Sequence, residues 1–348
     1  MVIIRDRLTP KERILALLTG QPLDRIPSAP LILNHASRVL RVKVSEYNQN
    51  GETMGKAHVA AWKRYGHDMI LIFSTTSTLA EAMGSKLHFP EDDAPYLEAP
   101  VVQSPEDIDK VRIPDPEKDG RLPVYLRALE ICNREVGDQV FVGCVFAAPF
   151  TTGAALRGTE DFIKETYKNR QLVNKLMEVA KEGAFRMIDA ILVRGGVPVM
   201  VEPVASGSLI SPAQFRKLVL PHLQEIVNYA HSKGSPIVLH ICGKTSQVIE
   251  LMAESGADVL SLDLIDLGEA KARVGDRVCL LGNVRPAETL LKGTPEQVRE
   301  ECRQVIAKAA DNPRGFILSS GCEVPFNTPP ENLDALIQAA REFGRNNQ

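Results

Sequence analysis

Two residues that can bind a metal stand two positions apart in the segment LHICGK, residues 239–244. They follow an apolar run that is typical of a buried β-strand. Because side chains alternate along a strand, His240 and Cys242 point to one face and Ile241 to the other. Gly243 then ends the run, which places both side chains at the carboxyl end of the strand. This imidazole and this thiol are therefore a candidate pair of metal ligands.

A third candidate ligand, Cys322, follows another apolar run, GFILSSG at 315–321. Two acids, Glu202 and Asp263, stand at the ends of two further runs. Two thiolates and one imidazole favour zinc in tetrahedral geometry. A structural zinc site would have four closely spaced protein ligands, whereas these ligands lie on different strands. The pattern thus predicts a catalytic zinc site with an open position, and a buried thiol beside a packed histidine stays the alternative.

The other cysteines and histidines have no partner of this kind nearby in the sequence. Four cysteines lie in helix or strand interiors, where we expect them to pack: Cys132, Cys144, Cys279 and Cys302. His35 follows the first apolar run, and we expect it to line the pocket. Packed or solvated roles are expected for His58, His67, His88, His222 and His231.

The elements that must position the three ligands alternate between short apolar runs and longer amphipathic stretches. Eight runs are candidate strands: 27–33, 68–73, 139–146, 197–203, 236–242, 258–263, 278–283 and 315–321. Most are almost continuously apolar, as parallel strands covered on both faces should be. Eight strand-then-helix units predict a (β/α)8 TIM barrel, whose catalytic groups lie at the carboxyl ends of the strands. An open doubly wound sheet is the alternative, but no G-x-G-x-x-G follows an early strand.

Several further segments refine this expectation. Thr9, Pro10 and Glu12 predict the capped start of an N-terminal helix. Other helices are expected at 160–194, 211–233, 245–257 and 294–310. Residues 74–138 are too long for a simple connection, and we expect a hairpin and a helix inserted over the barrel mouth. The whole chain, 1–348, is expected to form a single barrel domain.

Composition excludes several classes of function. The chain of 348 residues is 44% hydrophobic and has a formal net charge of -3. This balance gives no support for nucleic-acid or membrane-surface binding. No apolar stretch approaches the roughly 20 residues that span a bilayer, and charges interrupt the N-terminal MVIIRDRLTPKERI. We therefore expect a cytoplasmic enzyme with free or metal-bound cysteines.

The ligand types indicate the chemistry. Two thiolates already balance the charge of Zn²⁺, so this site is a weaker activator of water than a three-histidine site. A substrate thiol in the open position would still lose its proton on binding the metal. Such a thiolate is suited to attack an alkyl carbon, so alkyl transfer to sulfur is the leading expectation.

The motifs also resemble a known family. From TPKERILALLTGQPLDRIP to TPPENLDALIQAAREF the chain resembles the uroporphyrinogen decarboxylase superfamily, most specifically in HICGK, MAESGADVLSLD, VGDRVCLLGNVRP and SSGCEVPFNTPPENL. The decarboxylases carry an Arg-rich segment after the first strand and an Asp after the second. The segments LILNHASRVL and IFSTTSTL retain Arg38 and Arg41 but lack that spacing and that Asp. The chain is more similar to the zinc-dependent, corrinoid-linked methyltransferase branch.

This resemblance implies that His240, Cys242 and Cys322 bind Zn²⁺ and that the fourth ligand until substrate enters is Asp263, Glu202 or water. It implies methyl transfer between a methylcobamide and a thiol such as coenzyme M. The corrinoid would come on a separate carrier protein, since D-x-H-x-x-G is missing, and would dock at the barrel mouth. The alternatives are demethylation of a small methoxy or methylamine donor, transfer to tetrahydrofolate, porphyrinogen decarboxylation, and a non-catalytic zinc- or porphyrin-binding barrel.

Overall fold

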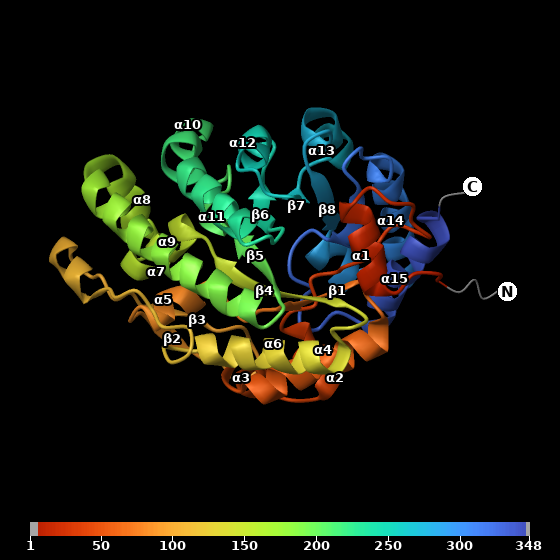
Figure 1. Cartoon of the computed structure of the whole chain (residues 1–348), viewed down its shortest axis with the longest axis horizontal. Coiled ribbons are helices and arrows are strands. Elements are labelled where there is room, and N and C mark those ends of the chain that lie inside the picture. Colours follow the sequence, from red (N-terminus) through yellow and green to blue (C-terminus); the bar gives the residue numbers. More distant parts are fainter. Residues whose placement is uncertain (1–5, 346–348) are drawn as a thin grey trace.

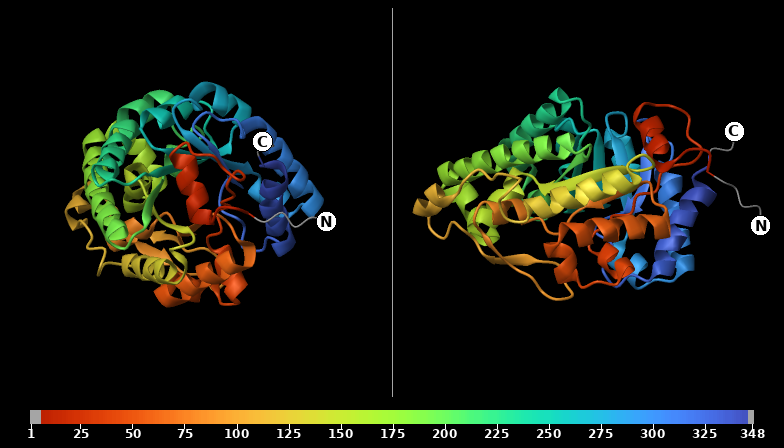
Figure 2. Two further views of the ribbon diagram at one scale, coloured as in Figure 1. Left: turned by 45° about the vertical axis from the view of Figure 1, so that its right-hand side comes forward. Right: turned by 60° about the horizontal axis from the view of Figure 1, so that its bottom comes forward.

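The computed structural model describes residues 6–345. Seven parallel strands form one curled sheet in the order β1-β4-β5-β6-β7-β8-β9 (Figures 1 and 2). The strands are β1 Met69–Ile72, β4 Phe141–Ala147, β5 Val197–Val201, β6 Val238–Lys244, β7 Val259–Leu264, β8 Cys279–Val284 and β9 Phe316–Ser320. Each of them falls within one of the predicted runs or overlaps it closely. The predicted α/β barrel is confirmed.

The predicted strand at 27–33 is wrong as a regular strand. It makes one isolated parallel bridge, between Ser28 and Leu318 of β9. On its other side the carbonyl oxygen of Ser28 accepts a hydrogen bond from the backbone N–H of Asp68, at 2.7 Å. Pro27 and Pro30 have no N–H to donate to a ladder. The segment therefore closes the gap between β9 and β1 without forming a continuous strand.

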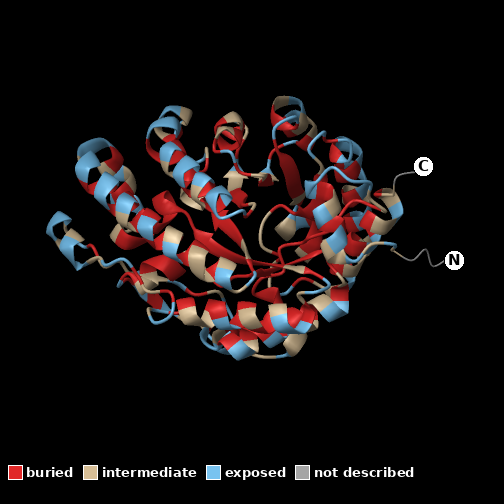
Figure 3. Ribbon diagram, viewed as in Figure 1, coloured by how far each residue is buried: buried red, intermediate tan, exposed pale blue. Residues whose placement is uncertain are grey.

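Helices alternate with the strands and cover the outside of the sheet. They are α1 Pro10–Leu18, α2 His35–Leu40, α3 Val44–Gln49, α4 Gly51–Tyr65, α5 Thr78–Ala82, α6 Leu122–Val136, α7 Pro149–Arg157, α8 Thr159–Lys168, α9 Arg170–Val193, α10 Pro212–Gln214, α11 Leu220–Ser232, α12 Ile249–Glu254, α13 Leu267–Val274, α14 Pro295–Ala309 and α15 Pro330–Phe343. Short helical turns lie at Pro105–Lys110, Pro203–Ala205, Phe215–Val219 and Pro286–Leu291. Buried faces turn toward the sheet and exposed faces turn outward (Figure 3).

Two of the predicted helices are interrupted. The stretch 160–194 divides at Asn169, whose φ of -143° is not helical and whose side chain accepts a hydrogen bond from Leu172 N to start α9. The stretch 211–233 begins with the short α10 and a π-helical turn before α11. The capped start predicted at Thr9 is present as a capping box, and Thr294 forms another capping box at the start of α14.

Residues 74–138 contain the predicted hairpin and helix. Strands β2 Lys86–His88 and β3 Tyr96–Ala99 pair antiparallel. The hydroxyl of Ser85 donates to the carbonyl of Ala155 at 3.1 Å, which ties the hairpin to α7 at the carboxyl end of β4. Helix α6 packs against α4, β1 and β4, so it lies along the barrel wall (Figure 2). The role of this segment as a cover and the single-domain extent of 1–348 stay predictions.

The core has two layers. Inward-facing side chains fill the barrel, and a larger cluster lies between the sheet and the helices. Helix α1 closes the amino end of the barrel, where Ile14 and Leu17 join the inner cluster. The inner cluster is almost entirely aliphatic, and its members include Leu71, Val145, Val199, Val201 and Leu281. This arrangement leaves the carboxyl end of the strands as the open end.

A buried ion network fixes the amino end of the barrel. The carboxylate of Asp68 contacts Arg13 at 2.5 Å and Arg25 at 2.7 Å, and the three side chains are at most 1% exposed. Asp68 also accepts a hydrogen bond from Ser28 N at 2.6 Å. The network thus ties α1 and the closing segment 27–33 to the start of β1. Among residues 6–345, no helix is long and apolar enough to cross a membrane.

Candidate metal centre

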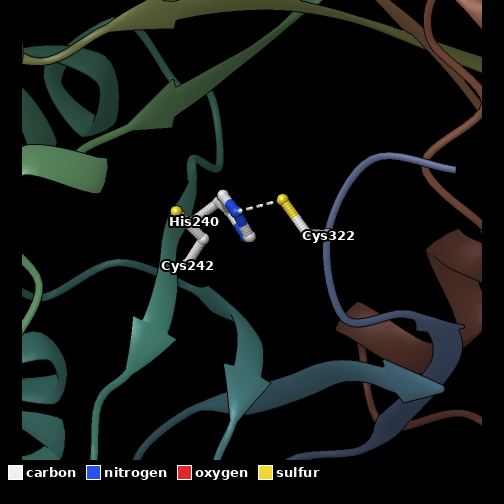
Figure 4. Close-up of side chains that lie close together, drawn as sticks. All are labelled: His240, Cys242 and Cys322. Atoms are coloured by element: carbon white, nitrogen blue, oxygen red, sulfur yellow. Dashed lines mark hydrogen bonds between the residues drawn. The ribbon is translucent and has the colours of Figure 1, made fainter. Parts of the chain in front are cut away.

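Three metal-binding side chains converge at the carboxyl end of the barrel. His240 and Cys242 project from β6, and Cys322 projects from the loop after β9 (Figure 4). One ligand atom from each residue lies within 4.8 Å of the other two, and Cys322 Sγ lies 3.8 Å from His240 Nε2. The curl of the sheet brings β6 and β9 face to face although two strands separate them. The structure therefore brings together the three ligands that the sequence predicted.

These separations fit a tetrahedral ion. A zinc–sulfur distance of about 2.3 Å places two tetrahedral sulfur ligands about 3.8 Å apart. The observed separations reach 4.8 Å at most, so the set would have to contract by about 1 Å to close around an ion. Soft thiolates and an imidazole in this arrangement match the donors that zinc prefers.

Ser261 orients the histidine ring. Its hydroxyl lies 2.9 Å from His240 Nδ1, and both side chains are at most 8% exposed. The two residues are register partners on β6 and β7. A metal ligated by Nε2 requires the proton on Nδ1, which then donates to Ser261 Oγ. Sequence reasoning missed Ser261, and its only signal was a polar residue inside the apolar run DVLSLD.

The two cysteine thiols shift each other's pKa in opposite directions. A hydrogen bond from Cys322 lowers the pKa of Cys242. Donating that hydrogen bond raises the pKa of Cys322, and burial raises it further. One thiol of the pair therefore ionises more readily than the other. A dication between the sulfur atoms would favour the thiolate form of both.

Asp263 lies beside the cluster but outside the group of ligand atoms. Its Oδ2 accepts a hydrogen bond from Gly243 N at 2.8 Å. Gly243 has a φ of +74°, a conformation that favours glycine. The carboxylate thus holds the turn that follows Cys242.

Glu202 is fully buried and points away from the cluster. Its carboxylate accepts hydrogen bonds from the backbone N–H groups of Phe150 at 3.2 Å and Thr151 at 2.5 Å, at the start of α7. Burial raises the pKa of Glu202 to about 7, against the opposing effect of these hydrogen bonds. Its own backbone N–H donates to the carbonyl of His240 at 2.9 Å. Glu202 therefore links α7 to β5 and β6.

An apolar cavity of about 160 Å³ opens beside the three ligands. Its wall consists of aliphatic and aromatic side chains together with a few polar groups, Thr76, Ser261, Glu323 and the three ligands themselves. The carboxylate of Glu323 accepts hydrogen bonds from Asn34 N at 3.0 Å and Asn34 Nδ2 at 2.8 Å. Burial raises the pKa of Glu323. Sequence reasoning missed Glu323, whose signal was its position directly after Cys322.

The remaining candidates have packing roles. His35 does not line the cavity: it is fully buried, with ring nitrogens 2.9 Å from the Phe326 carbonyl and 3.0 Å from the Tyr65 hydroxyl. This histidine therefore supports the loop after β9, and the expectation that it lines the pocket is wrong. The other four cysteines are all buried away from the cluster, and burial raises the pKa of each thiol: Cys132, Cys144, Cys279 and Cys302.

The chain is similar to several known proteins over nearly its whole length. The family model for uroporphyrinogen decarboxylase (URO-D) matches residues 9–343. The methylcobamide:CoM methyltransferase MtaA of Methanosarcina barkeri is 29% identical over 346 residues, covering 97% of this chain and 99% of that protein. The uroporphyrinogen decarboxylase of Psychromonas ingrahamii is 27% identical over 351 residues, covering 95% and 97%.

Among solved structures, a methyltransferase from Methanosarcina mazei superposes with a TM-score of 0.88 at 29% identity, covering 97% of this chain and 99% of that chain. The likeness thus extends over nearly the whole of both chains. The chain belongs to the uroporphyrinogen decarboxylase family, and it is similar to the methylcobamide-dependent methyltransferases within it.

Proposed function

We propose that this protein is a zinc- and corrinoid-dependent methyltransferase that moves a methyl group between a protein-bound methylcobamide and a thiol. The observation that carries the proposal is the convergence of His240, Cys242 and Cys322 at the mouth of an apolar cavity. Similarity to methylcobamide:CoM methyltransferase MtaA supports the methyl donor.

The three residues fit zinc by donor chemistry and by spacing. His240 would bind through Nε2, since Ser261 engages Nδ1, and the two cysteines would bind as thiolates. Bound zinc would lower the pKa of the substrate thiol, so that the thiol would be a thiolate at neutral pH. The apolar wall removes water from the sulfur and so preserves its nucleophilicity.

The reaction exchanges the carbon–cobalt bond of the methyl group for a sulfur–carbon bond. The substrate sulfur loses its proton to solvent and forms a bond to the methyl carbon. The carbon–cobalt bond breaks, and its electron pair stays on the cobalt of the corrinoid. The residues of this chain orient the sulfur and exclude water, and the corrinoid is a second substrate brought by a carrier protein.

The two acids are proposed to support the site from outside the ligand set. Asp263 holds the turn after Cys242 through Gly243 N, and Glu202 joins α7 to the strand that carries His240. Either carboxylate would have to leave these backbone N–H groups in order to bind the metal. A fourth ligand from substrate or water requires no such change.

Decarboxylation is disfavoured by the cavity. The substrate of the decarboxylases named above carries several carboxylates, and such a group needs cationic partners when it is buried. Arg38 donates to Asn327 Oδ1 at 3.2 Å, and neither Arg38 nor Arg41 lines the cavity. We therefore propose methyl transfer and not porphyrinogen chemistry.

Metal content and methyl transfer test the proposal. Elemental analysis should find about one zinc per chain, and Cys322→Ala should lose most of it. Cys302→Ala, a buried cysteine of α14 outside the cluster, is the matched control and should retain the metal. Retention of full zinc by Cys322→Ala would refute the ligand assignment.

The second measurement offers free methylcobalamin to the zinc-loaded protein and records the formation of cob(I)alamin as thiols or tetrahydrofolate are added. Demethylation with a thiol is the expected result. If no acceptor is methylated, but cob(I)alamin is methylated by a methoxy or methylamine compound, the protein works on the donor side.

A further inference from the structure

The charge of the cavity restricts what can bind beside the metal ligands. No lysine or arginine is among the residues that line it, within the described part of the chain. The one charged residue besides the ligands is Glu323, an acid. The rest of the wall is aliphatic or aromatic, apart from the hydroxyls of Thr76 and Ser261. A substrate in this cavity therefore meets no cation of the protein.

Two basic residues near the barrel mouth, Arg121 and Arg38, lie outside the lining of the cavity. Arg121 donates to Ser74 Oγ at 2.8 Å, but its guanidinium is paired with Glu81 at 2.9 Å and does not line the cavity. Arg38 lies against Asn327. Nη2 of Arg121 is buried and has no hydrogen-bond partner, but Arg121 is not among the residues that line the cavity.

From this charge inventory we propose that the small-molecule substrate is an uncharged or cationic, largely apolar thiol and not an anionic thiol such as 2-mercaptoethanesulfonate (coenzyme M). The inference rests on the proposed methyl transfer and specifies its substrate class. It departs from coenzyme M, the acceptor after which the Methanosarcina barkeri relative is named.

The physical reason is desolvation. An anion that enters an apolar cavity loses its hydration and finds no opposite charge to replace it. An ionised Glu323 would repel the anion, and a protonated Glu323 would offer it one hydrogen bond at most. A cationic group would be attracted by the same carboxylate, and an alkyl group gains by contact with the wall.

Size agrees with a small substrate. One water molecule needs about 10 to 15 Å³ of cavity volume, so a cavity of about 160 Å³ holds on the order of ten waters. The reaction on a neutral thiol releases one proton to solvent, forms the sulfur–methyl bond and leaves the carbon–cobalt electron pair on cobalt. Its product is a neutral thioether, which suits an apolar wall.

A series of thiols of similar size tests the proposal. Propanethiol, cysteamine and 2-mercaptoethanesulfonate are compared as acceptors for methylcobalamin with the zinc-loaded full chain. We expect kcat/KM for the sulfonate to be at least tenfold below that for propanethiol. Calorimetric titration with methyl propyl sulfide and 2-(methylthio)ethanesulfonate gives a second measurement that needs no turnover, and the neutral thioether should bind more tightly.

Glu323→Gln tests the role of the acid. In this variant the difference in kcat/KM between 2-mercaptoethanesulfonate and propanethiol should become smaller, and kcat/KM for cysteamine should fall. Glu331→Gln, at an exposed position in the first turn of α15, is the control and should change neither ratio. If Glu323→Gln fails to fold, the thiol series on the unaltered protein still decides.

The outcomes separate the two proposals. If the sulfonate compounds react or bind as well as the neutral compounds, the proposed substrate class is wrong and the proposed methyl transfer still stands. Failure to methylate any thiol would overturn thiol methylation, and thioether binding would then decide the substrate class alone. If neither thioether binds, the inference is wrong.

Discussion

The hydrogen bond between Ser261 and His240 offers a sharp test of the metal centre, because Ser261 is not itself a ligand. Its hydroxyl is the only partner within 2.9 Å of Nδ1 that the described structure provides, and Ser261 is 2% exposed. In Ser261→Ala the ring loses the group that fixes its orientation and its proton. Loss of such a partner lowers metal affinity by about 10- to 100-fold, which corresponds to about 1.4 to 2.7 kcal/mol.

The assay is competition for zinc between the protein and a chelator of known affinity, at fixed pH. Ser319→Ala is the matched control, because Ser319 is also a buried serine on a neighbouring part of the sheet, and it donates a single hydrogen bond to the Ala29 carbonyl at 2.7 Å. We expect the Ser261→Ala affinity to fall by at least tenfold and that of the control to stay within twofold. Equal affinities for the two variants would refute the reasoning that His240 binds a metal through Nε2.

Two further predictions concern the ion network at the amino end of the barrel. Asp68→Asn should lower the free energy of unfolding in urea by about 2 to 3 kcal/mol, because Arg13 and Arg25 lose their charged hydrogen bonds to the shared carboxylate, although Arg13 keeps Asp24 and Arg25 keeps Asp6. The exposed pair partner Asp334 is the control, and its Asn variant should lose no more than about 1 kcal/mol; similar losses would contradict a special role for burial. Burial alone would raise the pKa of Asp24, but hydrogen bonds from Arg13 and from backbone N–H groups lower it well below its usual range. The ionised carboxylate of Asp24 therefore contributes its full stabilisation above the unfolded pKa of about 3.9, and this stabilisation is lost as the pH falls further. The free energy of unfolding of Asp24→Asn should thus decrease less between pH 5 and pH 3 than that of the wild type. An equal decrease would argue against this linkage.

The sequence predicted the barrel because its strands are buried on both faces and are therefore continuous in apolar residues. It failed at 27–33, where two prolines interrupt the ladder of an otherwise apolar run, and at Asn169, where a side-chain cap restarts a helix. The roles of Ser261 and Glu323 were not predicted from the sequence, for a different reason. Their roles depend on which residues face each other across strands, and that register is set by the closed barrel and not by local spacing.

The two acids at the strand ends show what strand position alone can and cannot predict. Strand position placed both acids correctly at the carboxyl ends of their strands. Whether a side chain points into or out of the barrel depends on the alternation of side chains along the strand. Val199 and Val201 of β5 face the cavity, so Glu202, the next residue, points to the helix layer, where the start of α7 binds it. That parity was available in the sequence and argues against Glu202 as a ligand.

Asp263 has the inward parity of Ser261, yet it also lies outside the ligand set. The pairing of β6 with β7 shifts register between Ile241 and Lys244, and this irregularity presents Gly243 N to the carboxylate at 2.8 Å. The bond satisfies the acid and fixes the backbone that carries Cys242. Because both acids are engaged by backbone N–H groups, the site that we propose has three protein ligands, and its fourth ligand would come from the cavity. We therefore expect substrate to reach the metal without displacing a protein side chain.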